Sequence, residues 1–126
     1  MIGYVTVGVS DMEKSAAFYD AVFSELGIGR MMEMDGFIMW GTDMTSCGFC
    51  IMKPYDGKAM TAGNGTMFGV AAKSKADVDK VYARAIAEGG TCEGKPGPRG
   101  DESMGFYAGY FRDPDGNKLD CYVFGG

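Results

Sequence analysis

The chain has 126 residues, which fits one domain, and 46% of them are hydrophobic against 23% charged. These fractions are ordinary for a globular protein and exclude intrinsic disorder and fibrous repeats. Twelve Lys and Arg against 17 Asp and Glu give a net charge of −5. This acidic balance argues against nucleic acid or an anionic membrane surface as the main partner.

Histidine is absent from the chain, whereas glycine occurs 21 times and methionine 11 times. The absence of histidine removes the commonest metal ligand and the usual general base near neutral pH. Any function must therefore run without imidazole. The glycines follow no collagen period and indicate many tight turns, while the flexible methionine side chains suit a core or an adaptable apolar cavity.

No segment approaches the roughly 20 apolar residues that a membrane helix needs, and a strand-like pattern begins at residue 2 without a signal peptide. We therefore expect a cytoplasmic protein with reduced cysteines. The four cysteines are Cys47, Cys50, Cys92 and Cys121. Cys47 and Cys50 have the spacing of a thioredoxin motif, but a strand pattern follows where that motif needs a helix, so small packing residues are expected.

The first half of the chain predicts a strand, a helix and three further strands. Residues 2–9 alternate as a strand does. The two faces of this strand carry Val5, Val7 and Val9 on one side and Tyr4, Thr6 and Gly8 on the other. Ser10 and Glu13 have the spacing of a capping box, which predicts a helix over about residues 11–26, up to Gly27. Strand patterns follow near residues 29–34, 37–41 and 48–53.

The second half repeats this order of elements. A strand pattern over residues 66–72 precedes a second capping box at Ser74 and Asp77, and a helical stripe that includes Ile86 ends at Gly89. Further strands are expected near residues 91–93, 106–112 and 118–124.

The two halves correspond at a fixed offset of 63 residues. Adding 63 to Tyr4 gives Met67, and adding it to Tyr19 gives Tyr82. The sequence therefore predicts an α+β domain made of two βαβββ units. The units span about residues 1–53 and 65–126, and a polar, glycine-containing link spans residues 54–64.

Three segments carry a family resemblance: Val9–Tyr19, the loop Gly97–Arg99 and the run Phe106–Asp120, whose turn at residues 113–117 is the most specific part. Together they resemble the glyoxalase/bleomycin resistance protein/dioxygenase family, which is the vicinal oxygen chelate superfamily. The resemblance covers essentially the whole chain. It implies two βαβββ repeats that form curved mixed sheets around a cavity, completed by a homodimer.

The same resemblance implies where a metal would bind. In enzymes of the family, His or Glu side chains from the first and last strand of each unit hold a divalent metal. Carried over, these positions hold Tyr4, Met67, Asp120 and either Phe49 or Cys50. A phenol, a thioether and one carboxylate poorly suit Zn, Ni, Mn or Fe(II), so we expect no metal and no other cofactor.

Asp120 is the candidate catalytic residue, because it is an acid in a strand whose other face is expected to pack on a helix. In a cavity with Tyr4 and Tyr122, burial would raise the pKa of Asp120 and make it a general base, with Tyr4 as the acid. The alternative is that Asp120 hydrogen-bonds these tyrosines and fixes the shape of the cavity.

The candidate ligand-binding residues have aromatic, polar or sulfur-containing side chains. They are Tyr4, Thr6, Trp40, Met67, Arg99, Tyr107, Asp120 and Tyr122. Arg99 stands in a loop rich in Pro and Gly and is expected to act as a lid or to contact an anion. For each aromatic residue the alternative is an ordinary place in the core.

The sequence favours a metal-free small-molecule binding protein, similar to the bleomycin-resistance branch, that holds a drug or metabolite without transforming it. The alternative is an enzyme of the family: a lyase or isomerase of the lactoylglutathione lyase type, or a dioxygenase, either metal-dependent or with Asp120 as base. In both cases the expected partners are a small molecule and a second copy of the chain, with no nucleic acid and no membrane.

Overall fold

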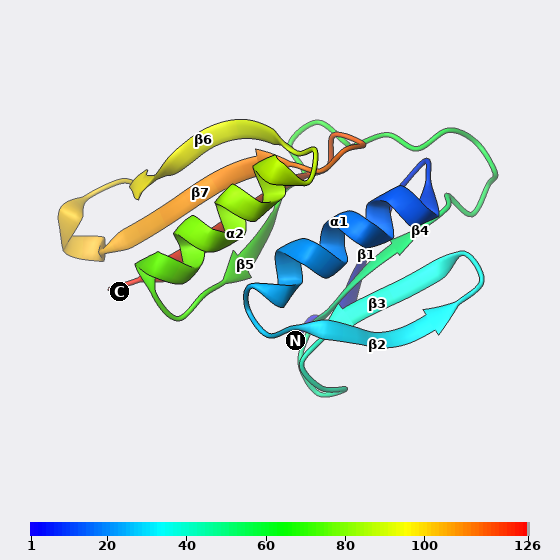
Figure 1. Ribbon diagram of the computed structural model, residues 1–126, viewed down its shortest axis with the longest axis horizontal. Coiled ribbons are helices and arrows are strands. Elements are labelled where there is room, and N and C mark those ends of the chain that lie inside the picture. Colours follow the sequence, from blue (N-terminus) through cyan, green and yellow to red (C-terminus); the bar gives the residue numbers. More distant parts are fainter. Residues whose placement is uncertain (126) are drawn as a thin grey trace.

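Two four-stranded sheets of the same topology form the framework of the computed structural model, which describes residues 1–125 (Figure 1). The first sheet has the order β1-β4-β3-β2, and the second has the order β5-β8-β7-β6. In each sheet the first pair is parallel and the others are antiparallel. The strands of the first sheet are β1 (Tyr4–Gly8), β2 (Gly29–Met34), β3 (Phe37–Gly41) and β4 (Gly48–Met52). Those of the second are β5 (Phe68–Ala71), β6 (Thr91–Pro98), β7 (Phe106–Arg112) and β8 (Lys118–Phe124). The predicted pair of βαβββ units is confirmed.

One helix accompanies each sheet: α1 (Met12–Ser24) and α2 (Lys75–Ala87). The capping box of α2 is confirmed, because the Ser74 side chain accepts a hydrogen bond from the backbone N–H of Asp77. The expected cap at Ser10 is wrong. Asp11 caps α1 by accepting from the backbone N–H of Lys14, at 3.1 Å, whereas the Ser10 hydroxyl donates to a distant carboxylate.

The remaining boundaries differ from expectation by a few residues. The strand β6 runs through Pro98 rather than ending near residue 93, with two irregularities in its register against β7. A short 3-10 helix, Glu102–Met104, follows it. Ile86 lies on the solvent side of α2 and is 37% exposed, so the buried stripe of this helix consists of Val78, Val81 and Ala85.

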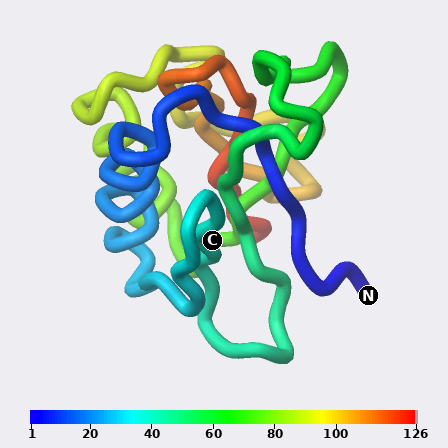
Figure 2. The backbone as a smooth tube through the Cα atoms, turned by 90° about the vertical axis from the view of Figure 1, so that its right-hand side faces the viewer, coloured from blue at the N-terminus to red at the C-terminus, as the bar shows by residue number. Residues whose placement is uncertain are grey.

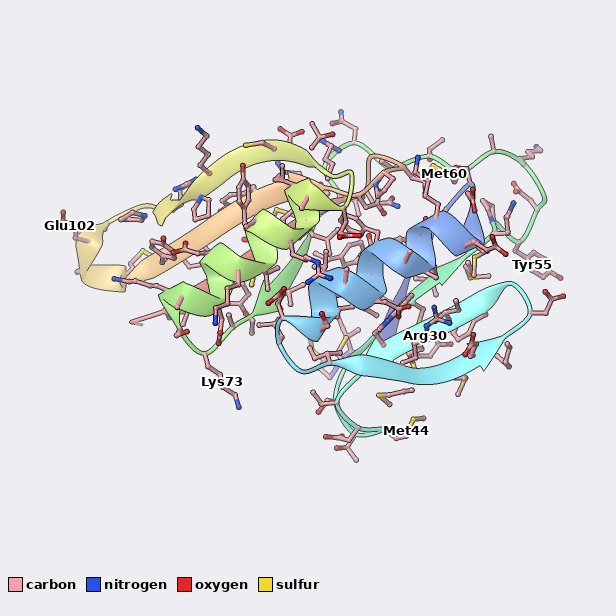
Figure 3. All side chains as sticks on the ribbon, viewed as in Figure 1. Arg30, Met44, Tyr55, Met60, Lys73 and Glu102 are labelled. Atoms are coloured by element: carbon pink, nitrogen blue, oxygen red, sulfur yellow. The ribbon has the colours of Figure 1, made fainter. Side chains whose placement is uncertain are left out.

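Both helices lie on the same side of the sheets, next to each other (Figure 1), and the strands lie on the other side with the link between the units (Figure 2). The core fills the space between helices and sheets. Tyr19 of α1 is fully buried there, with its ring centroid 4.9 Å from that of Phe49 and 5.7 Å from that of Trp40. In the link, by contrast, Tyr55 points away from the molecule and is fully exposed (Figure 3).

A buried carboxylate joins the two units. Asp113, in the turn between β7 and β8, accepts a 2.6 Å hydrogen bond from the hydroxyl of Tyr19 in α1. The same carboxylate accepts bonds from Asn117 and from the backbone N–H of Asp115. The Asn117 amide also donates to the carbonyl of Gly8 in β1, at 3.0 Å. The turn that the sequence singled out is therefore the polar connection between the units, because a buried carboxylate is stable only when donors surround it.

We expect Tyr19→Phe to lower the free energy of unfolding by about 2 kcal/mol, because the substitution leaves the buried Asp113 carboxylate without one of its donors. Urea denaturation measures this. The control is Tyr107→Phe, which removes a hydroxyl bond of the same length to the exposed Asp79 and should cost less than about 0.5 kcal/mol. Equal losses in the two variants would contradict the role given to Asp113.

Candidate functional site

The face of each sheet turned away from the helices is called its open face here. On β8, Leu119, Cys121 and Val123 are buried on the helix side, as the sequence predicted, so the even-numbered residues form the open face. The strand register extends this face across the second sheet. Its members on β5, β7 and β8 are Gly69, Ala71, Phe106, Ala108, Tyr110, Arg112, Lys118, Asp120, Tyr122 and Phe124.

Asp120 is the central polar group of this open face. Its side chain is 3% exposed, and its Oδ1 atom is buried without a hydrogen-bond partner in residues 1–125. Gly69 is its register partner on β5, and a Cβ at this position would lie 3.0 Å from Asp120 Oδ1. The absence of a side chain at Gly69 therefore gives the carboxyl group its place.

Burial raises the pKa of Asp120 to about 6, and the positive charge of Lys118 opposes this shift. The alternative in which Asp120 hydrogen-bonds the neighbouring tyrosines gains no support from Oδ1, because this atom accepts no bond within the described chain. A buried acid without partners costs free energy unless something donates to it. The Oδ1 atom of Asp120 is thus a buried acceptor that no group of the described chain uses.

Aromatic rings surround Asp120 on the same face. Tyr122 stacks on Phe106 with ring centroids 5.7 Å apart. Tyr110 is the register partner of Asp120 on β7, and the Arg99 guanidinium lies 5.4 Å from its ring centroid. Arg99 donates to the carbonyls of Lys95 and Pro98, at 2.6 and 3.1 Å, so its side chain is fixed above the sheet.

Two of the predicted ligand-binding residues lie elsewhere. Trp40 is paired with Phe49 on the helix side of the first sheet, and its indole N–H donates to Asp20 of α1. Asp20 also pairs with Arg30 of β2, which Figure 3 labels. Tyr107 is on the helix side of β7, where its hydroxyl donates to Asp79 of α2. The prediction that these two rings share a cavity with Asp120 is therefore wrong, since both point to the opposite face.

The first-unit residues predicted for the site lie on the open face of the first sheet. Tyr4 and Thr6 are register partners of Gly48 and Cys50, and Tyr4 is 62% exposed. No hydrogen bond within residues 1–125 joins Tyr4 to Asp120, so the expected acid–base pair is not assembled in a single chain. Met67 precedes β5 and is 43% exposed.

The register settles which residue corresponds to Asp120 in the first unit. Gly69 pairs with Asp120, and Thr6, 63 residues earlier, pairs with Cys50. Cys50 is therefore the fourth position implied by the family resemblance. Phe49 instead points to the helices, with its ring against Phe23.

The side chains at the four implied metal positions do not fit a divalent metal. Burial raises the pKa of the Cys50 thiol to about 11, so it remains protonated, and Tyr4 and Met67 supply a phenol and a thioether. No group of three Cys, Asp or Glu side chains comes together in the described part of the chain. One carboxyl group does not make the donor set that Zn, Mn or Fe(II) needs.

Sequence reasoning missed Gly69 and Lys118 as parts of the site. A signal for Lys118 exists, because residues two positions apart on a strand share a face, as Lys118 and Asp120 do. A signal for Gly69 exists in the 63-residue offset from Thr6.

Neither helix within residues 1–125 is long and apolar enough to cross a membrane.

Comparison with known proteins gives consistent matches. A family model for the Glyoxalase/Bleomycin resistance protein/Dioxygenase superfamily matches residues 1–120. A crystal structure of a glyoxalase/bleomycin resistance protein from Albidiferax ferrireducens T118 is 40% identical, with a TM-score of 0.88 and 98% of each chain covered. A lactoylglutathione lyase from Agrobacterium tumefaciens is 22% identical, with a TM-score of 0.69, over 98% of this chain and 92% of that one. The comparison with curated proteins gave no match.

The raised pKa of Asp120 predicts a stability that depends on pH. The folded state holds the Asp120 proton more tightly than the unfolded chain does, so the free energy of unfolding contributed by this group falls as pH rises from about 4 to above 6. Asp120→Asn removes this loss. The substitution should raise the free energy of unfolding by on the order of 2 kcal/mol at pH 8 and leave it almost unchanged at pH 4.

Urea denaturation at the two pH values measures the difference. The matched control is Asp35→Asn, in the exposed turn between β2 and β3, which should change neither value. An Asp120→Asn variant that is less stable than the parent at pH 8 would show that the carboxylate has a partner.

Proposed function

Because the chain belongs to the Glyoxalase/Bleomycin resistance protein/Dioxygenase superfamily, we propose that it is a metal-free small-molecule binding protein whose ligand donates to Asp120. The single observation that supports this is the buried Oδ1 atom of Asp120 without a partner. A ligand with an amine or another strong donor would satisfy this atom and stabilise the ionised form of the acid. The proposed ligand class is an amphipathic drug or metabolite.

The rings beside Asp120 support the amphipathic character of the ligand. Phe106, Tyr110 and Tyr122 offer aromatic faces, on which an apolar or positively charged group gains favourable contacts. The Arg99 and Lys118 cations already lie over Tyr110, at 5.4 and 5.9 Å from its ring centroid. The Phe106 and Tyr122 rings are therefore the better place for a ligand cation, next to the carboxylate.

An enzyme is the second candidate function, and the pKa of Asp120 supports it. A carboxyl group with a pKa of about 6 is suited to take a proton near neutral pH, as a lyase or isomerase requires. The cation on the same face, Lys118, could stabilise the resulting negative charge on a substrate, but it already lies over the Tyr110 ring, 5.9 Å from its centroid. Binding without turnover is therefore the function we favour.

We also propose that two copies of the chain associate through their open faces. Four exposed large hydrophobic residues lie on or directly beside these faces: Tyr4, Met34, Met67 and Phe124. Each unit is one of the two repeats, and its helix lies on the side of the sheet opposite to the open face (Figure 1). A second copy, with the same faces, would cover this surface and enclose the ligand.

A thermal-shift titration tests the proposed function with three kinds of probe: bleomycin as a cationic amphipathic compound, the adduct of methylglyoxal and glutathione, and the chlorides of Zn, Ni and Mn. We expect bleomycin to raise the melting temperature and the metal salts to leave it unchanged. Asp120→Asn should weaken binding of a cationic ligand about 10-fold or more, because it removes a charge-assisted hydrogen bond, and should spare a neutral ligand.

Three results would contradict the proposal. The first is one equivalent of a transition metal per chain that survives dialysis. The second is turnover of the adduct by the original protein that disappears in Asp120→Asn while binding persists, which would establish the enzyme. The third is unchanged affinity for the cationic ligand in that variant.

Light scattering tests the dimer. At micromolar concentration we expect twice the chain mass, and Met34→Lys should weaken association about 10-fold or more because it buries a charge in an apolar interface. The control is Ile86→Lys, on the solvent side of α2 and therefore across the sheet from the open faces, which should have no effect. A monomer at these concentrations, or equal behaviour of the two variants, would contradict the arrangement.

A further inference from the structure

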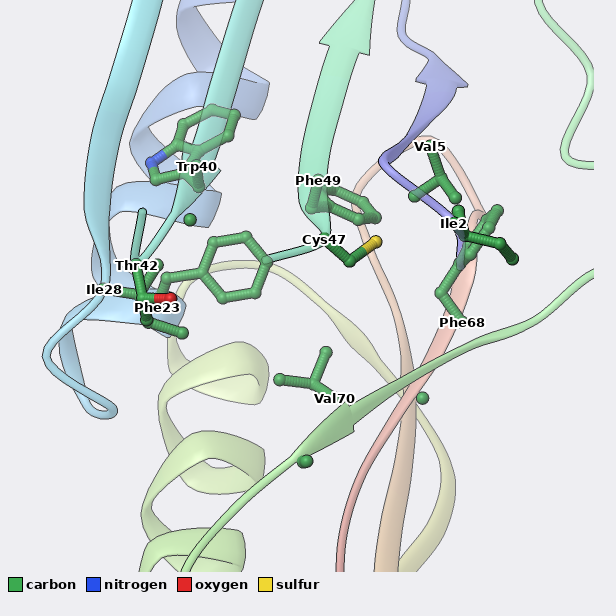
Figure 4. Close-up of a pocket in the computed structure, with 13 residues that line it drawn as sticks. Ile2, Val5, Phe23, Ile28, Trp40, Thr42, Cys47, Phe49, Phe68 and Val70 are labelled. Atoms are coloured by element: carbon green, nitrogen blue, oxygen red, sulfur yellow. The ribbon is translucent and has the colours of Figure 1, made fainter. Parts of the chain in front are cut away.

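A cavity lies at the junction of the two units, lined by β5 of the second unit and by residues of the first (Figure 4). Its volume is about 420 Å³, within the range of small-molecule sites. Gly69 and Val70 are successive residues of β5, so their side-chain positions point to opposite faces. Gly69 faces Asp120, whereas Val70 points into this cavity, which is called the junction pocket here.

The junction pocket exists because two sheet edges meet there without pairing. The strands β1 and β5 are the outer strands of their sheets, and neither is the register partner of the other. Side chains rather than backbone hydrogen bonds therefore fill the space between them. Phe49 of the first unit and Phe68 of the second meet edge to face, with ring centroids 5.9 Å apart.

The lining of the pocket has no charged side chain. Trp40 is part of the wall, but its indole N–H is already donated to Asp20, at 2.9 Å. The remaining polar side-chain groups are the hydroxyl of Thr42 and the thiol of Cys47, both from exposed residues. A charged or strongly polar molecule would lose its water without gaining partners, which is unfavourable.

From this lining we propose that the junction pocket binds a neutral, mainly apolar small molecule with an aromatic body. The rings of Phe23, Phe49, Phe68 and Trp40 supply apolar walls and edge or face contacts for such a group. Cys47 lines the same pocket, so its thiol would lie beside a molecule bound there (Figure 4). The pocket shares Gly69 and Ala71 of β5 with the open face, but neither Asp120 nor one of the rings around it lines the pocket, so its occupant differs from the proposed ligand of Asp120.

The neutral fluorescent amine N-phenyl-1-naphthylamine is the probe that tests this proposal. Trp40 is the one tryptophan of the chain, so energy transfer from it to the probe reports binding to the chain, and the variants below locate the site. We expect saturable quenching of the Trp40 emission, with one probe per chain. Val70→Phe fills the pocket and should weaken binding about 10-fold or more, whereas Asp120→Asn should leave it unchanged.

A thiol measurement on the unmodified protein keeps the test decisive if Val70→Phe folds poorly. Cys47 and Cys92 are both exposed, whereas Cys50 and Cys121 are buried. Bound probe should slow the reaction of N-ethylmaleimide with Cys47 about 10-fold and leave Cys92 unaffected, since Cys92 lies on β6, outside the lining. Non-saturable quenching, equal protection of both thiols, or loss of binding in Asp120→Asn would overturn the proposal.

Discussion

The hydrogen bonds around Asp113 determine how the two units lie together. The carboxylate is buried in the turn between β7 and β8, and it receives the hydroxyl of Tyr19 from the helix of the other unit. Burial raises the pKa of Tyr19 well above its ordinary value, and the nearby Asp113 charge adds to this effect, so the phenol remains a donor. With Asn117 also bonded to Gly8, the second unit is held to α1 and to β1 at once. The side-by-side helices, the unpaired edges of β1 and β5, and the junction pocket all depend on that placement.

Asp120 and Asp113 show opposite uses of a buried acid. Asp113 is surrounded by donors and contributes to the fold, whereas Asp120 has an oxygen atom that receives nothing from the described chain. The second arrangement is unfavourable for the folded protein alone, and such groups concentrate at functional sites. The corresponding position of the first unit holds Cys50, which is buried as a small apolar residue. One of the two equivalent positions thus holds a buried acid, and the other holds a small packing residue.

Local patterns predicted most of the fold. The alternation of β8 and the cap at Ser74 were readable because each depends on residues a few positions apart. Ser10 and Asp11 are both good capping residues. The choice between them depends on Asp115, which lies 105 residues after Ser10 and accepts a hydrogen bond from the Ser10 hydroxyl. The extension of β6 to Pro98 depends on pairing with β7, against the low strand preference of its Gly and Pro residues.

The face on which Trp40 or Tyr107 lies could not be predicted from residue type, because an aromatic ring suits a core and a cavity equally. The junction pocket depends on how two sheets approach each other, which no local pattern encodes.

The contacts that join the units also have a consequence for the order of folding. Tyr19 and Asp113 are 94 residues apart in the chain, and Asn117 and Gly8 are 109 apart, so each contact closes a loop of most of the chain length. Closing such loops is entropically unfavourable until the intervening elements are compact. During synthesis, α1 and the first sheet can form before residue 113 has been made. The Tyr19 hydroxyl therefore stays without its carboxylate until the turn after β7 has been made, so this connection between the units cannot form earlier in synthesis.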